Sequence, residues 1–109
     1  DQATAHCDAL SEEMLPGMVA AQRLRDAALA RAALEAWRRT GGPVAVITGA
    51  GHADRERGIP AALAEAAPGL SVLSIGQFEA PPADPPPFDL WLVTEPAERE
   101  DPCAAFAAN

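Results

Sequence analysis

The stretch Pro43-Val44-Ala45-Val46-Ile47-Thr48, followed by Gly49-Ala50-Gly51-His52, decides the expected fold. Residues 43–48 form a short, continuous apolar run bounded by glycines. Such a run is typical of a strand that is covered on both faces in a parallel sheet. We therefore predict a central strand at 43–48, with the glycine-rich loop at its carboxyl end.

The residues before this strand predict a long helix from Pro16 to about Trp37. Apolar side chains recur there at helical intervals, and alanine, leucine and arginine are good helix formers. Pro16 suits the first helical turn, where its missing N–H costs nothing. Two arginines followed by two glycines suit the end of the helix, at residues 38–42.

The residues after the loop predict a helix at 60–67 and strands at 70–75 and 88–93, with a proline-rich spacer at 80–87. A strand, a helix and a strand in this order predict a right-handed parallel crossover. We expect strand 43–48 to pair with 70–75, and 88–93 to extend the same sheet. The expected fold class is α/β: a three-layer-like unit with a short, mainly parallel sheet and flanking helices, within a larger α/β fold.

Composition argues against nucleic-acid binding and against a membrane-spanning segment. The formal net charge is −8, with eight arginines, no lysine and sixteen carboxylates, which argues against nucleic-acid binding. No apolar run approaches the roughly 18 residues that suggest a membrane span.

The two cysteines, Cys7 and Cys103, lie near opposite ends of the chain. Two inert thiols and one disulfide are both compatible with this spacing.

The loop at 49–52 is the main candidate for chemistry, because ligands of open α/β sheets lie beyond the carboxyl ends of the strands. Gly49 and Gly51 allow close approach of a ligand, and His52 offers a donor, an acceptor and a metal-binding nitrogen. A tight turn with a surface histidine is the alternative. The loop lacks the dinucleotide, phosphate-loop and nucleophile-elbow patterns. A self-contained zinc site is not expected, because the other histidine, His6, is distant.

A second polar group lies on the long helix. Gln22, Arg25 and Asp26 have i, i+3 and i+4 spacings and so share one helical face. A solvated stripe and a buried network between Arg25 and Asp26 are both compatible with this pattern.

Several segments together resemble the carboxyl-terminal half of the ChaN-like family of haem-binding uptake proteins. They are Gln22-Arg23-Leu24-Arg25-Asp26, residues 48–52, Gly58-Ile59-Pro60 and residues 69–77, and the resemblance runs from about Leu15 to Gln77. The chain departs from the family pattern at Ala50, where asparagine is usual.

The resemblance implies an exported bacterial protein of the periplasm or cell envelope, linked to haem or iron uptake. It implies that residues 1–109 are one α/β domain or fragment, the carboxyl-terminal part of a longer protein. Membrane attachment would be only through a lipid anchor absent from this chain. An exported setting also implies a disulfide between Cys7 and Cys103.

The implied cofactor is haem, or another small, planar, anionic ligand. Haem iron takes His, Met, Cys or Tyr as an axial ligand, and this chain has no tyrosine. His52 is therefore the candidate metal ligand, and Arg25 or Arg55 the candidate partners of the propionates. Gln22, Gly49 and Gly51 complete the expected binding site.

Two other functions remain open. The first is a metal-dependent or acid/base hydrolase of a related superfamily, whose catalytic residues lie mostly upstream of this chain. The second is a non-catalytic interaction module completed by a partner, and a homodimer is compatible with the sequence. Whether the protein is an enzyme, and which residues would be catalytic, is left open at this point.

Overall fold

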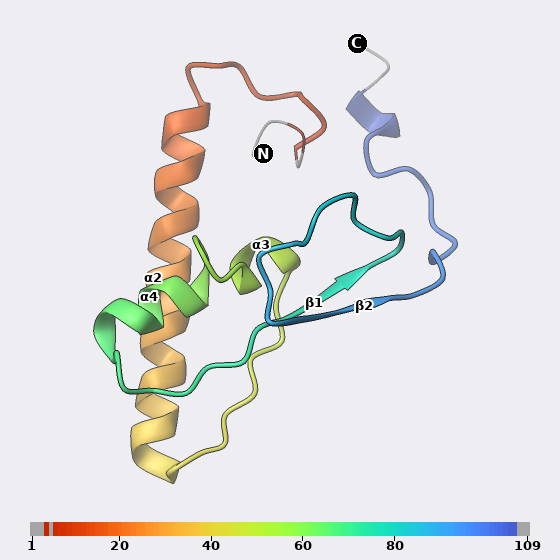
Figure 1. Cartoon of the computed structure of the whole chain (residues 1–109). Helices are drawn as coiled ribbons and strands as arrows, with labels where there is room; N and C mark the ends of the chain where they lie inside the picture. The colour runs from red at the N-terminus through yellow and green to blue at the C-terminus, as the bar shows by residue number, and fades with distance from the viewer. Residues whose placement is uncertain (1–3, 5, 107–109) are drawn as a thin grey trace.

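The structure, a computed structural model, describes residue 4 and residues 6–106. Its elements are helices α2 (Leu15–Thr40), α3 (Ala50–Ala53) and α4 (Ile59–Ala66), strands β1 (Ile75–Phe78) and β2 (Leu90–Val93), and the 3-10 turn η1 (Ala104–Phe106). Figure 1 shows the long helix α2 along one side, with the other elements beside it. This mixture confirms the predicted α/β class.

Helix α2 confirms the predicted long helix and extends slightly beyond both predicted ends. Pro16 lies in its first turn. Gly41 ends it in the left-handed conformation, with φ of 78°, and donates its N–H to the carbonyl of Trp37 at 2.8 Å. Glycine adopts this conformation without the steric cost that a Cβ brings, so the helix ends at the glycine pair that the sequence offers as its stop signal.

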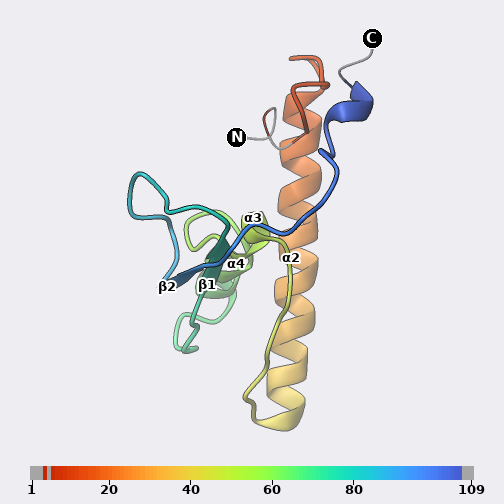
Figure 2. The ribbon, with the colours of Figure 1, turned by 90° about the vertical axis from the view of Figure 1, so that its right-hand side faces the viewer.

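The core lies between α2 and α4. Ala30 and Leu34 of α2 are buried against Ile59 and Leu63 of α4. Helix α3 contacts both α4 and β1, and Figure 2 shows α3 and α4 on the same side of α2. The short helix that carries His52 is thereby held between the long helix and the sheet.

The sheet has two parallel strands, in which Ile75 pairs with Leu90 and Phe78 with Val93. The prediction of a parallel strand near residues 88–93 is confirmed. Residues 79–89 connect the two strands and contain no helix among them. All four side chains of β2 are exposed.

The predicted strand at 43–48 and its pairing with 70–75 are wrong in this structure. Residues 43–49 are not part of any strand. The strand predicted at 70–75 is observed only from Ile75 onward, as β1. A cavity of about 620 Å³ lies between the two segments and is lined by both, among others by Val46 and Val72. A strand needs ladder hydrogen bonds from a neighbouring strand. Within the described chain, residues 43–48 have no such neighbour, because the cavity lies beside them. Ile47, which does not line this cavity, is 100% exposed.

The two ends of the described chain are joined covalently. A disulfide links Cys7 to Cys103, with 5.4 Å between the Cα atoms, which confirms the predicted pairing. No helix among residues 6–106 is long and apolar enough to cross a membrane.

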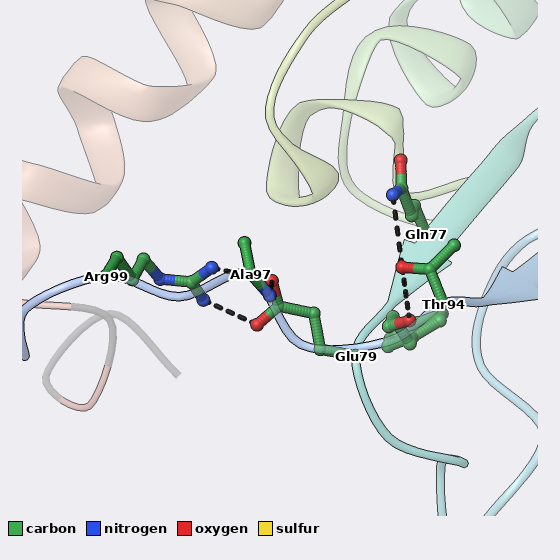
Figure 3. A network of polar contacts seen from close by, with 6 residues as sticks. Gln77, Glu79, Thr94, Ala97 and Arg99 are labelled. Atoms are coloured by element: carbon green, nitrogen blue, oxygen red, sulfur yellow. Dashed lines mark hydrogen bonds and ion pairs between the residues drawn. The ribbon is translucent and has the colours of Figure 1, made fainter.

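A second attachment holds the carboxyl-terminal segment to the sheet (Figure 3). Arg99 donates to both carboxylate oxygens of Glu79, at 2.6 and 2.5 Å, and the N–H of Ala97 donates to Oε1 at 3.2 Å. These bonds, with that from Arg99 the largest cause, lower the pKa of Glu79 to about 2. Nearby, Gln77 donates to the Thr94 hydroxyl at 3.3 Å.

Candidate functional site

His52 is placed by the single turn of α3. Gly49 precedes this turn in an extended conformation, and the His52 N–H donates to its carbonyl at 3.0 Å. Behind the turn the chain passes very close to itself. A Cβ on Gly58 would lie 2.3 Å from the carbonyl oxygen of His52. Only glycine fits there without moving the backbone, so Gly58 fixes the path of the histidine loop.

The His52 imidazole is paired with a buried carboxylate. Its Nδ1 lies 2.6 Å from Oδ1 of Asp26, and the Asp26 residue is only 3% exposed. At this distance a proton lies between the two atoms, and we assign it to Nδ1 because an ionised carboxylate can only accept. The Nε2 atom then keeps its lone pair for a ligand or a proton.

Gln22 lies one helical turn before Asp26 and reaches the same ring. Its amide nitrogen is 2.9 Å from Nδ1 and 3.5 Å from Nε2 of His52. With the proton on Nδ1, the amide N–H can donate only to Nε2. The glycines border this group at ordinary contact distances: a Cβ on Gly49 would be 4.0 Å from His52, and one on Gly51 would be 3.9 Å from Gln22. The structure therefore brings Gln22, Gly49, Gly51 and His52 together.

The two arginines of the predicted site lie elsewhere. Arg25 is exposed on α2, and the ion pair of Asp26 is with His52, so the alternative of a buried Arg25–Asp26 network is wrong. Arg55 donates to Oδ1 of Asp89 at 2.6 Å, and its backbone N–H donates to the carbonyl of Pro87 at 2.9 Å. Arg55 thus ties the histidine loop to the segment before β2.

Asp89 and Ser74 complete this attachment. The backbone N–H of buried Ser74 donates to Oδ2 of Asp89 at 2.7 Å, and the Ser74 hydroxyl donates to the carbonyl of Ala53. The bond from Ser74, followed by that from Arg55, lowers the pKa of Asp89. The residue that follows His52 is therefore held directly against the residue that precedes β1.

His52 stands at the boundary of two hollows. The first, the apolar cavity of about 620 Å³, is lined by His52 and mainly by apolar side chains, which include Trp37, Val44, Val46, Leu63, Leu70 and Val72. The second, which we call the polar groove, is lined by the two partners of His52, Gln22 and Asp26, and by charged side chains such as Asp54, Glu56 and Arg57. The Asp26–His52 bond therefore links a residue that lines the apolar cavity to a residue that lines the polar groove.

This arrangement fits the iron and the apolar face of a haem group. A cavity of this size is in the usual range for small-molecule sites, and Nε2 of His52 is the kind of nitrogen that serves as an axial ligand. No arginine among the described residues lines the cavity. Within residue 4 and residues 6–106, no group of three His, Cys, Asp or Glu side chains could hold a bare metal ion.

The comparisons with known proteins agree with the sequence resemblance. The model of a family described as haem-binding uptake, Tiki superfamily, ChaN matches residues 1–63. This match covers more than half of the chain, and the protein belongs to this family. The matched part contains both Asp26 and His52 and ends within α4. Neither the curated proteins nor the solved structures include a match.

Sequence reasoning missed the role of Asp26. It placed Asp26 on the same face as Gln22 but considered only Arg25 as its partner. The i, i+4 spacing of Gln22 and Asp26 was the available signal, because two hydrogen-bonding side chains on one stripe can hold a single ring between them. Which ring they hold depends on how α3 packs against α2.

Proposed function

We propose that this protein binds haem through His52 and takes part in haem or iron uptake outside the cytoplasm. The observation that carries the proposal is the position of the His52 ring. Buried Asp26 holds its Nδ1, and the ring borders the apolar cavity. Because the imidazole is already oriented, its Nε2 can bind an iron atom without the side chain losing further conformational freedom.

In this proposal, Nε2 of His52 binds the iron, and the apolar cavity receives the porphyrin face. Haem supplies an iron centre that changes between the ferric and ferrous states. Gln22, whose amide nitrogen is 3.5 Å from Nε2, would have to move aside for a ligand at that atom. Arg25 is exposed and free to approach a propionate from α2, whereas Arg55 would have to leave Asp89 to do so.

The cellular setting is part of the same proposal. A disulfide between residues 7 and 103 is expected of a protein in an oxidising compartment, such as the periplasm or cell envelope. We propose that the chain is the carboxyl-terminal part of a longer bacterial protein.

Titration with ferric haem, followed by absorbance at the Soret band, tests the proposal. His52→Asn is the informative variant, because its amide can still donate to Asp26 while providing a poor iron ligand. We expect the affinity to fall at least tenfold in His52→Asn and to stay unchanged in His6→Asn, which serves as the matched control. Equal affinity for the unaltered chain and His52→Asn would contradict the assignment.

The same pair supports a second candidate, an acid/base hydrolase. A histidine whose Nδ1 donates to a buried carboxylate can take a proton from water at Nε2, because the carboxylate stabilises the resulting imidazolium. In this case a chromogenic ester or phosphoester would be cleaved by the unaltered chain. His52→Asn and Asp26→Asn would both abolish the cleavage, and haem would not bind.

A further inference from the structure

We propose that Asp26 is a positioning residue that makes the His52 site selective for ferric over ferrous haem. This inference rests on the proposed haem function and deepens it, because it names the oxidation state of the ligand. It concerns a residue that does not touch the ligand and acts only through His52.

The strength of the Asp26–His52 hydrogen bond is the first step. The bond is short, at 2.6 Å, and the carboxylate is almost completely removed from solvent. Hydrogen bonds to an ionised acceptor are stronger than neutral ones, and a low local dielectric strengthens them further. The carboxylate therefore draws the Nδ1 proton toward itself and leaves more electron density on the rest of the ring.

The consequence appears at Nε2. A carboxylate behind a ligating histidine raises the basicity of the ligand atom. A ferric centre carries one more positive charge than a ferrous centre, so it gains more from a more basic nitrogen. The pair stabilises the ferric state more than the ferrous state, which lowers the reduction potential of the bound iron.

In the described part of the chain, no neighbouring arginine neutralises the negative charge of Asp26. Its ion pair is with His52, and no arginine among the described residues forms a salt bridge with it. Arg23 and Arg57 also line the polar groove, but neither forms a salt bridge with Asp26, and Arg57 lies 3.5 Å from Asp54. The negative charge therefore acts mainly on the histidine.

Asp26→Asn separates this electronic role from a merely structural one. Asparagine has nearly the same shape and retains an oxygen that accepts the Nδ1 proton, so the ring stays oriented while the charge is lost. Glu65→Gln is the matched control. It removes the same charge from another side chain that lines the polar groove, on α4, and the hydrogen bonds of the His52 ring are with Gln22 and Asp26 and not with Glu65.

The experiment measures the affinity for ferric and ferrous haem separately, and the reduction potential of the haem-loaded whole chain. We expect Asp26→Asn to lower the ferric-to-ferrous affinity ratio about tenfold, the lower end for a residue behind a metal ligand. A tenfold change corresponds to a rise in the potential of about 59 mV for one electron. Glu65→Gln should leave both unchanged.

Asp26→Glu provides a second test that does not depend on the stability of the asparagine variant. It keeps the charge and should keep the ferric preference, while its longer side chain weakens the binding of both states. An unchanged ratio in Asp26→Asn, or a lost preference in Asp26→Glu, would overturn the inference. Failure of the unaltered chain to bind haem would instead overturn the proposed function, and this inference with it.

Discussion

The carboxylate of Asp26 and the imidazole of His52 meet at 2.6 Å, although they lie on different helices and 26 residues apart in the chain. Asp26 is on α2 and His52 is on α3. Their bond fixes the tautomer of the ring and fastens the histidine loop to the long helix. One contact thus contributes both to the stability of the fold and to the chemistry of the candidate site.

The first prediction concerns stability. His52→Ala leaves the Asp26 carboxylate buried without its donor, which should lower the free energy of unfolding by about 3 kcal/mol. His52→Asn keeps a donor at the same place and should lose clearly less. Urea unfolding followed by circular dichroism measures both. Equal losses in the two variants would show that the hydrogen bond to Asp26 is not the reason.

The second prediction concerns Gly58. Its Cβ in Gly58→Ala would lie 2.3 Å from a backbone oxygen that cannot move independently. We expect a loss of about 1–3 kcal/mol in unfolding free energy and weaker haem binding, because the loop that carries His52 must shift. Gly17→Ala is the control, since nothing lies within 4 Å of the added Cβ. A Gly58→Ala protein as stable as Gly17→Ala would refute the close approach.

The third prediction concerns the disulfide. It closes a loop with a sequence separation of 96 residues, and the chain-entropy model gives up to about 4.7 kcal/mol for a loop of this size. The double variant Cys7→Ser with Cys103→Ser should therefore melt at a much lower temperature. Haem affinity below the melting transition should change little, because the disulfide is not part of the histidine site. A melting temperature equal to that of the unaltered chain would argue against the linkage.

The fourth prediction concerns acid stability. The pKa of Glu79 is lowered from 4.5 to about 2. Its stabilising contribution is thus complete above about pH 4.5 and is lost as the pH falls toward 2. Glu79→Gln should make the unfolding free energy less dependent on pH in this window. If the pH dependence there were the same in Glu79→Gln and the unaltered chain, the ion pair with Arg99 would not form in solution.

The parts of the fold that local sequence determines were predictable. Helix α2 has its own start and stop signals in Pro16 and Gly41, and these hold wherever the helix packs. The run at 43–48 has equally clear strand-like composition, but a strand also requires a hydrogen-bonding neighbour, and the apolar cavity separates it from residues 70–75. Composition reports the preference for a strand and not the presence of a partner.

The candidate site shows the same division. The glycine-rich loop indicated His52 as a candidate, because paired glycines are a local signal that the sequence shows even though the strand predicted before them does not form. The role of Asp26 depends on how α3 lies against α2, and that placement depends on the close approach at Gly58 and on the attachment of Ser74 to Ala53. The Ser74–Ala53 bond joins residues 21 apart in the chain, and the Asp26–His52 bond joins residues 26 apart, so neighbouring residues do not reveal either contact. Arg55 was expected to bind a propionate. The sequence did not reveal its actual partner, Asp89, because Asp89 lies 34 residues away.

The central claim is that a nitrogen of His52 binds haem iron. The chain has only two histidines, so the claim can be tested by labelling histidine with ¹⁵N and measuring its magnetic coupling to ferric haem iron by electron–nuclear double resonance. The account predicts a strong ¹⁵N coupling in the unaltered chain and in His6→Asn, and its loss in His52→Asn. Bound haem without this coupling, or a coupling that disappears in His6→Asn, would contradict it.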